Sequence, residues 1–177
     1  MAPLAADERT DDQRELLAPL GGAGALNIFA TIVRHPGLFR RWIPFAGKLL
    51  QGSRLPARER EIVILRVAWR CRAPYEWAQH VAIAEDAGLS ADEIRRVGAG
   101  PDADGWSGAD ATLLRAVDEL HDDHCITDAT WSALGAGLDD RQLIELPMLA
   151  GHYALLAGVL NSLGVQPEGR LPALGEV

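Results

Sequence analysis

The hydrophobic residues of this chain recur at helical rather than strand spacing, and this feature constrains the fold most. No segment shows a strong alternation of apolar and polar residues, which half-buried strands require. Ser90-Ala91-Asp92-Glu93 and Asp139-Asp140-Arg141-Gln142 have the residue types of a capping box, which starts a helix, and Gly88 is placed to end one. We therefore expect an all-α fold whose helices are mostly joined by short turns.

The length and composition suit one domain with a hydrophobic core. The chain has 177 residues, of which 48% are hydrophobic. We expect an N-terminal arm over residues 1–25, a helical domain over 26–166, and a mobile C-terminal tail over 167–177. Pro44 is expected to kink or interrupt its helix.

The charge and cysteine content exclude several classes of protein. The net charge is −8 and no basic patch stands out, so nucleic acid is not expected as a partner. Two cysteines outside any Cys-x-x-Cys motif indicate a reduced, cytoplasmic protein, and the N-terminus does not have the pattern of a signal peptide. The apolar stretch 146–165 contains Pro147, His152 and Asn161, so we interpret it as a buried core helix and expect no membrane association.

Candidate acid and base groups gather around Tyr75-Glu76-Trp77-Ala78-Gln79-His80. Glu76 and His80 are four residues apart and share a helix face, and Glu61 lies on the preceding helix. Such groups serve general acid/base catalysis, with no obvious metal or nucleotide beside them. Each also has a structural interpretation: His80 as a histidine bonded to a backbone carbonyl, Glu76 and His80 as a surface pair, and Glu61 as a solvated acid in the first turn of a helix.

Other polar residues in apolar surroundings leave two interpretations open. Arg66 either pairs with Glu61, which is the expected arrangement, or binds a substrate carboxylate. His152 is either a core residue or lines a pocket. His121, His124 and Cys125 have partial metal-ligand spacing, but histidines are common at helix ends, and we expect no metal site.

The chain resembles the carboxymuconolactone decarboxylase family, which shares its fold with the AhpD-type alkylhydroperoxidases. The resemblance is carried mainly by Arg58-Glu59-Arg60-Glu61 and Glu76-Trp77-x-x-His80, with support from Ala87-Gly88-Leu89-Ser90 and from 160–165. It implies an AhpD-like helical bundle that assembles into a homotrimer or homohexamer.

The peroxidase branch of this fold carries a Cys-x-x-Cys-x-x-x-His motif. With His80 on the motif histidine, Ala73 and Glu76 stand at the two cysteine positions, and Glu61 falls on the family's upstream glutamate. The thiols that reduce a peroxide are therefore missing. The chain is closer to the decarboxylase branch, which lacks both cysteines and keeps the histidine.

The resemblance implies a decarboxylase that needs no cofactor and acts in aromatic compound catabolism on a small carboxylic acid or lactone. A carbonyl within such a substrate can take up the electrons that remain after loss of carbon dioxide. His80 is expected to carry the proton, Glu61 to orient it or relay the proton, and Glu76 to tune the local charge. The residues expected to bind the substrate are Arg66, Trp77, Tyr75 and His152.

Two alternatives remain at this point. The first is a redox protein that uses Cys71, whose pKa we expect Arg70 and Arg72 to lower. The second is a non-enzymatic helical oligomer that binds a ligand or partner in the same pocket.

Overall fold

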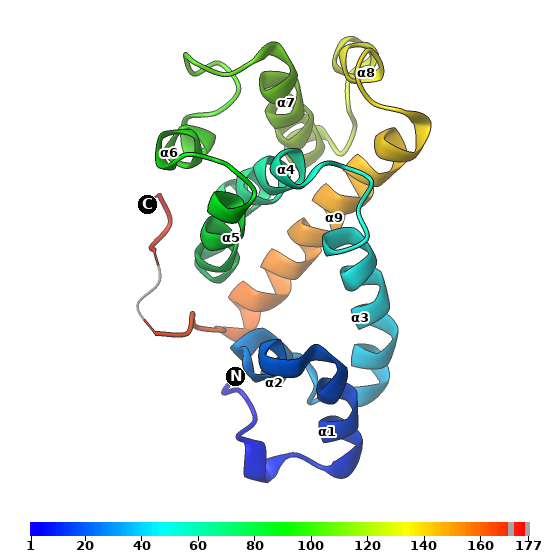
Figure 1. Cartoon of the computed structure of the whole chain (residues 1–177), viewed down its shortest axis with the longest axis vertical. Coiled ribbons are helices and arrows are strands. Elements are labelled where there is room, and N and C mark those ends of the chain that lie inside the picture. The colour runs from blue at the N-terminus through cyan, green and yellow to red at the C-terminus, as the bar shows by residue number, and fades with distance from the viewer. Residues whose placement is uncertain (170–171, 176–177) are drawn as a thin grey trace.

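The chain folds into a bundle of α-helices, which confirms the all-α prediction (Figure 1). The computed structural model describes residues 1–169 and 172–175, and this part of the chain contains no strand. Two short 3-10 helices span Ala6–Glu8 and Ala18–Ala25. The α-helices are α1 (Asp11–Leu17), α2 (Asn27–Ile32), α3 (Pro36–Leu50), α4 (Ala57–Arg70), α5 (Pro74–Asp86), α6 (Ala91–Ala99), α7 (Gly108–Asp123), α8 (Asp128–Gly135) and α9 (Asp140–Leu163).

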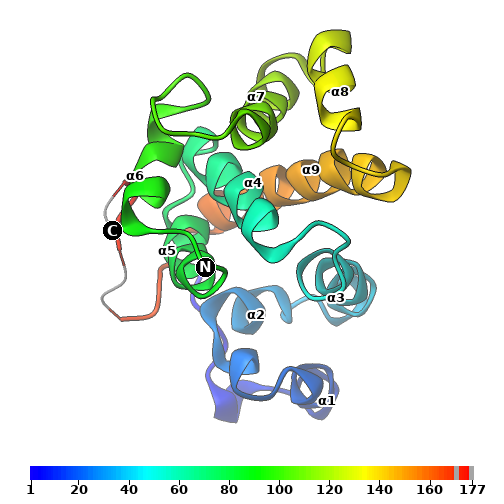
Figure 2. The same cartoon turned by 45° about the horizontal axis from the view of Figure 1, so that its top comes forward.

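Helix α4 is the centre of the domain. It packs against α5, α6, α7 and α9, and Figure 2 shows it between α5 on one side and α7 and α9 on the other. Every residue from 61 to 68 is buried, which is expected for a helix that is covered on all sides rather than along one stripe. Any polar side chain in this stretch is therefore forced into the protein interior.

Two hydrophobic clusters meet at α4. One lies between α4, α7 and α9 and includes Val63, Val117 and Leu149. The other lies between α4, α5 and α6 and includes Trp77 and Ile94. Because α4 contributes to both clusters, the position of α5 relative to α9 is fixed through α4.

Capping side chains mark the helix boundaries much as the sequence predicts. Ser90 and Asp139 each accept a backbone N–H and complete a capping box at the starts of α6 and α9. Gly88 follows α5 with a φ of +96°, a backbone conformation that favours glycine. The expected interruption at Pro44 is wrong, because α3 continues through this residue.

The predicted N-terminal arm is helical over residues 6–8 and 11–25, and a few of its side chains pack against the domain. Leu17 of α1 forms a small cluster with Val33 and Phe39, and the Leu4 N–H donates to the Ala30 carbonyl at 3.0 Å. At the other end of the chain, residues 170–171 and 176–177 of the predicted tail lie outside the described residues.

Helix α9 is the one helix of the described residues that is long and apolar enough to cross a membrane. In the fold it packs against α3, α4, α7 and α8, and half of its apolar window is buried. Core helices of soluble proteins pass the same test of length and composition.

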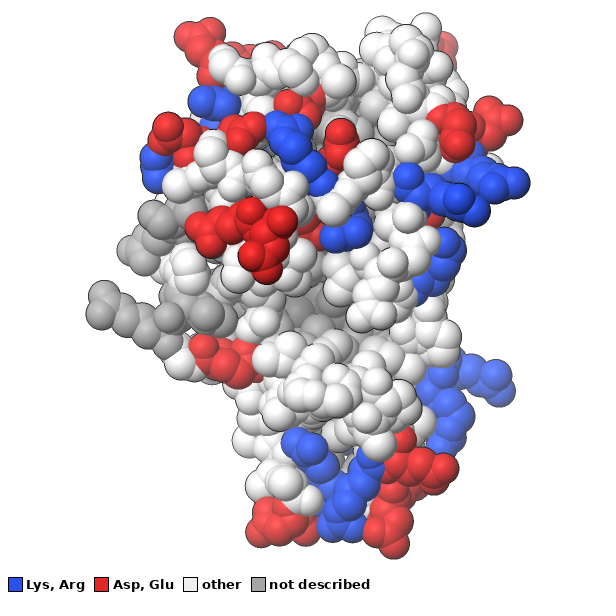
Figure 3. All heavy atoms as spheres, viewed as in Figure 1, with Lys and Arg blue, Asp and Glu red and all other residues white. Residues whose placement is uncertain are grey.

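On the face shown in Figure 3, acidic and basic side chains are interspersed over the upper and lower parts of the molecule.

Arg58 connects the first turns of α4, α6 and α7 through hydrogen bonds. Its guanidinium donates to both Asp110 oxygens, at 2.7 and 3.2 Å, and also to the Glu93 carboxylate. Glu93 in turn accepts the Ser90 N–H at 2.8 Å. This backbone hydrogen bond, followed by the Arg58 guanidinium, lowers the pKa of Glu93 to about 2.

We expect Glu93→Gln to lower the free energy of unfolding at neutral pH by about 1 kcal/mol. Because the pKa of Glu93 is about 2 in the folded state, against 4.5 for an ordinary glutamate, its ionised form stabilises the fold above pH 4.5. This stabilisation is lost as the pH falls from 4.5 to about 2. Denaturant unfolding of both proteins over a series of pH values measures the effect.

The control for this prediction is Asp92→Asn, because the Asp92 side chain is on the same helix and is 75% exposed. We expect it to leave the pH profile of stability unchanged. A difference between wild type and Glu93→Gln that persists undiminished down to pH 2 would contradict the assignment.

Candidate active site

The structure brings Glu61 and His80 into direct contact between α4 and α5. The Glu61 Oε2 atom lies 2.7 Å from the His80 Nδ1 atom. Glu61 has no exposed surface and His80 is 6% exposed, so the pair is shielded from water. The interpretation of Glu61 as a solvated acid at the start of a helix is therefore wrong.

The second oxygen of Glu61 is also occupied. The Arg60 Nε–H donates to Glu61 Oε1 at 2.9 Å, and the Arg60 side chain is 13% exposed. Glu61 thus links a guanidinium to an imidazole. Sequence reasoning missed Arg60, because residues adjacent in a helix do not share a face and the spacing gave no reason to pair them.

The contact with Glu61 determines which nitrogen of His80 is available to a ligand. A carboxylate only accepts hydrogen bonds, so Nδ1 carries the hydrogen toward Glu61. Among the described residues, the Nε2 atom of His80 has no hydrogen-bond partner. This nitrogen is therefore free to exchange a proton with a bound molecule.

Glu76 lies one helical turn before His80 but has a different environment. It is 2% exposed, and neither of its carboxylate oxygens has a hydrogen-bond partner among the described residues. Burial raises its pKa well above that of an ordinary glutamate. Glu76 therefore holds its proton to a higher pH than an ordinary glutamate does, and its protonated form can donate a hydrogen bond. The expected surface pair between Glu76 and His80 does not form, because His80 bonds to Glu61.

Helix α9 contributes Tyr153 to the same cluster. Its ring meets the His80 ring edge-on, with centroids 5.1 Å apart. Burial raises the pKa of the Tyr153 hydroxyl, the charge of Glu61 acts in the same direction, and Glu76 adds to the effect only when it is ionised, so the hydroxyl stays protonated. Sequence reasoning did not select Tyr153 as a site residue; the only signal was its place beside His152 in an otherwise apolar helix.

His152 lies on the other side of Tyr153, within an aromatic cluster. Its ring stacks on Trp42 at 6.3 Å and meets Phe45 and Tyr153 edge-on, each at 5.3 Å. Burial lowers the pKa of His152, so its imidazole is neutral at neutral pH. The structure thus places this predicted substrate-binding residue next to the acid/base cluster, behind Tyr153.

Arg66 does not pair with Glu61, contrary to the expectation. Its guanidinium makes two hydrogen bonds of 2.7 Å to Asp118 of α7, and it also donates to the carbonyls of Val97 and Gly98 at 2.8 and 3.2 Å. The donors of Arg66 are therefore used to join α4, α6 and α7. This arrangement does not favour the expected role of Arg66 in binding a substrate carboxylate.

The two aromatic candidates on α5 have separate environments. Trp77 is completely buried and packs on Trp69, with ring centroids 5.8 Å apart. It is therefore a core residue in this structure. Tyr75 is also buried, and its hydroxyl donates to Glu168 of the C-terminal segment at 2.9 Å. Neither side chain joins the cluster around His80.

Cys71 has a raised pKa, which contradicts the expected activation of its thiol. Burial is the main cause, Glu76 adds to it when it is ionised, and only Arg70 opposes it. The Cys71 Sγ atom lies 3.9 Å from His121 Nδ1, and both residues line a pocket of about 480 Å³ between α4, α7 and α9. Among the described residues, no group of three or more histidine, cysteine, aspartate and glutamate side chains is placed to hold a metal ion.

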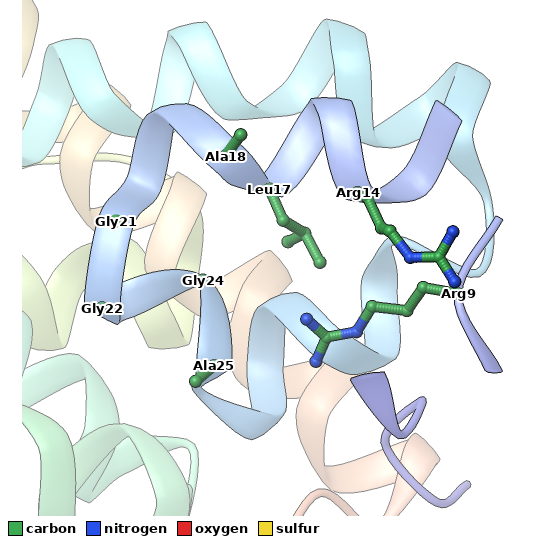
Figure 4. A pocket seen from close by; sticks show the side chains of 8 residues that line it. All are labelled: Arg9, Arg14, Leu17, Ala18, Gly21, Gly22, Gly24 and Ala25. Atoms are coloured by element: carbon green, nitrogen blue, oxygen red, sulfur yellow. The ribbon is translucent and has the colours of Figure 1, made fainter. Parts of the chain in front are cut away.

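A second pocket, of about 270 Å³, lies at the N-terminal segment (Figure 4). Arg9, Arg14 and Leu17 contribute side chains to it, and the backbone around Gly21 and Gly24 forms its other wall. None of the acid/base residues lines this pocket. The candidate site is therefore the buried cluster, which is made by Glu61, Glu76, His80 and Tyr153.

Comparison with known families agrees with the resemblance seen in the sequence. Residues 36–119 match the carboxymuconolactone decarboxylase family. The matched segment runs from α3 into α7 and contains Glu61, Glu76 and His80, whereas Tyr153 lies beyond it. No curated protein sequence matches the chain.

Solved structures of AhpD-like proteins have the same fold. An uncharacterized peroxidase-related protein from Ralstonia eutropha JMP134, described as an alkylhydroperoxidase AhpD core, has a TM-score of 0.82 at 17% identity, with 95% of this chain and 91% of that chain covered. A peroxidase-related protein from Silicibacter sp. TM1040 has a TM-score of 0.81 at 15% identity, with 95% and 92% covered. The debrominase Bmp8, solved with 2,3,4-tribromopyrrole, has a TM-score of 0.76 at 13% identity, with 95% and 91% covered. At these identities the likeness shows the fold alone.

We expect Glu76→Gln to be more stable than the wild-type protein at neutral pH, with a gain that grows as the pH rises above 4.5. The unfolded chain ionises Glu76 near pH 4.5, whereas the folded chain holds the proton to a higher pH. Stability is therefore lost as the pH rises above 4.5, and a neutral glutamine avoids this loss. Unfolding curves of both proteins between pH 4.5 and neutral pH measure the difference.

Glu85→Gln is the matched control, because Glu85 is an exposed glutamate on the same helix. We expect no comparable pH-dependent gain from it. If Glu76→Gln destabilised the protein most strongly at neutral pH, Glu76 would be ionised and paired in the folded state.

Proposed function

We propose that the protein is a cofactor-independent decarboxylase of the 4-carboxymuconolactone type, or one that acts on a related keto acid or lactone. The observation that carries the proposal is the buried contact between Glu61 and His80, which leaves one imidazole nitrogen free beside a protonated Glu76. The match to the carboxymuconolactone decarboxylase family supports it.

The proposed reaction replaces a carbon–carbon bond by a carbon–hydrogen bond. Cleavage of the bond to the substrate carboxylate releases carbon dioxide, and the electron pair moves into the substrate's carbonyl or lactone group. His80 then gives the proton on Nε2 to the carbon, and Glu61 holds the imidazole in place through Nδ1. The proton on His80 is replaced from solvent, so one proton is consumed for each carbon dioxide released.

Glu76 and Tyr153 have a complementary role in this mechanism. Both keep their protons at neutral pH, because burial raises the pKa of each group. A protonated carboxyl and a phenol can both donate hydrogen bonds to an oxygen that gains negative charge in the transition state. These donors supply the stabilisation that a developing enolate needs in a site shielded from water.

The environment of the cluster also fits loss of a carboxylate. Arg60 and Arg66 of α4 are already paired, Arg60 with Glu61 and Arg66 with Asp118. A substrate carboxylate at His80 would therefore find neither of these two guanidinium groups free to neutralise it. Such surroundings favour conversion of the charged carboxylate into neutral carbon dioxide.

Thiol-dependent peroxide reduction is less well supported. Ala73 and Glu76 stand where the peroxidase branch has its cysteines, and the remaining nearby thiol, Cys71, has a raised pKa. A thiolate is the reactive form of cysteine, so a raised pKa makes Cys71 a weaker nucleophile at neutral pH. The other alternative is a protein that binds a ligand without converting it. The activity test would favour this alternative if no turnover were found.

We expect the purified protein to release carbon dioxide from 4-carboxymuconolactone and His80→Ala to lose about 10²–10⁴-fold in kcat, the usual contribution of a positioned acid/base group. Glu61→Gln should also be impaired, because a glutamine can present its amide rather than an acceptor to Nδ1. Steady-state carbon dioxide release measures both effects.

Cys71→Ser is the control variant and should keep wild-type turnover. Full activity in His80→Ala would remove His80 from the mechanism. If the wild-type protein consumed a peroxide in a way that depended on Cys71, the thiol alternative would replace the decarboxylase proposal.

We also propose that the protein is a homotrimer or homohexamer. One face of α9 carries large apolar side chains that are open to solvent in the single chain: Ile144 is 66% exposed, Met148 49% and Leu155 62%. They recur along one side of the helix together with Gly151 and Gly158, and these glycines would let a second helix approach closely. Apolar patches of this kind usually mark protein interfaces.

We expect Leu155→Glu to break this assembly, because it would bury a charge in an apolar interface. Light scattering coupled to size-exclusion chromatography should show the mass falling from that of the oligomer toward that of one chain. Leu38→Glu is the control, since Leu38 is a similarly exposed leucine on α3. An unchanged mass in Leu155→Glu would remove this face from the interface.

A further inference from the structure

The segment after α9 places a carboxylate on α5. Glu168 accepts hydrogen bonds from the Tyr75 hydroxyl at 2.9 Å, from the Gln79 side-chain amide, and from the backbone N–H of Asn27. Figure 1 shows this segment leaving the end of α9 and passing α5 on its way toward α6. Three donors from separate parts of the domain thus converge on one acid.

The donors are held in place by the domain rather than by the tail. Tyr75 is 2% exposed, and its oxygen accepts the Ile28 N–H at 3.2 Å, which directs its own hydrogen toward Glu168. Gln79 lies one turn further along α5, on the same face as Tyr75. One Glu168 oxygen receives Tyr75 and Asn27, and the other receives Gln79. The arrangement matches both oxygens of a carboxylate.

We propose that Tyr75, Gln79 and the Asn27 N–H form a carboxylate-binding site that Glu168 occupies in cis. If Glu168 leaves, a buried phenol and two N–H groups lose their partner, and such unpaired donors are costly. The site therefore has affinity for another carboxylate that can reach it. Because a tethered group has a high effective concentration, a free acid competes with Glu168 only weakly in the wild-type chain.

The tail is positioned to act as a removable ligand. It is attached on one side by Val165, which is buried, and by the Asn27 side chain, which donates to the Gln166 carbonyl at 2.9 Å. On the other side, Leu174 packs against the cluster that contains Trp77. Glu168 thus lies between two other attachments of the tail to the domain, Val165 with Gln166 on one side and Leu174 on the other.

The chemistry of the site selects its ligand. All three donors are neutral, so the site gives one carboxylate three hydrogen bonds, two to one oxygen and one to the other, but brings no positive charge to neutralise a dianion. We therefore assign it to monocarboxylates with a small apolar group. Tyr75 and Gln79 lie on the α5 face that neighbours the one carrying Glu76 and His80. The proposal does not depend on the decarboxylase reaction.

The test is rescue of a full-length variant that lacks the internal acid. Glu168→Ala empties the site and should lower the melting temperature. Millimolar sodium propionate should then raise the melting temperature of Glu168→Ala by about 2–4 °C more than that of wild type, since a ligand stabilises the state that binds it. Sodium chloride of the same ionic strength is the reference, and sodium phosphate should give no rescue.

The double variant Glu168→Ala with Tyr75→Phe identifies the donors. It keeps the aromatic ring but removes the hydroxyl, so the additional propionate effect should disappear. Equal propionate effects in wild type, Glu168→Ala and the double variant would overturn the proposal and leave Glu168 as a tail anchor only. If Glu168→Ala does not fold, Glu168→Ser provides the same comparison, because its short side chain also leaves the position of the carboxylate empty.

Discussion

The buried carboxylate of Glu61 is the constraint on which the rest of the site depends. A charged group without any exposed surface is tolerated only when hydrogen bonds and opposite charge compensate for lost hydration. Helix α4 cannot turn Glu61 toward water, since it is covered by α5, α6, α7 and α9. Compensation has to come from within the domain, and it comes from Arg60 and His80. This requirement fixes the register of α5 against α4 and, with it, the direction of the free imidazole nitrogen.

Glu61 and Glu76 show how one fold gives two glutamates different chemistry. Both are buried beside Tyr153, but Glu61 has two partners and Glu76 has none among the described residues. Without partners, burial dominates and Glu76 holds its proton, so it can donate where Glu61 can only accept. A reaction that moves both a proton and negative charge requires one group that accepts a hydrogen bond and another that donates one. Glu61 and Glu76 are such a pair.

The sequence predicted the helices well, because the signals involved are local. A capping box such as Ser90 to Glu93 fixes a helix start through neighbouring residues alone. The contact between Glu61 and His80 was foreseen mainly through the family motif, since the two residues are nineteen positions apart in the sequence. Partners that are distant in the sequence were not foreseen. Asp118 accepts hydrogen bonds from Arg66, and Glu168 accepts one from Tyr75. Both partners depend on how α7 and the tail pack, which no local pattern encodes.

The buried acids point to where the protein has been built for function. Among the described buried carboxylates, Asp110 is held by Arg58, Glu145 by Ser53 and the Arg54 N–H, and Glu61 by Arg60 and His80. Glu76 alone lacks a donor. An unsatisfied buried acid weakens the fold at neutral pH, and an aliphatic residue at this position would avoid that cost. Glu76 lowers the stability of the fold and lies one helical turn from His80. Its presence there is best explained if a bound ligand completes its hydrogen bonds.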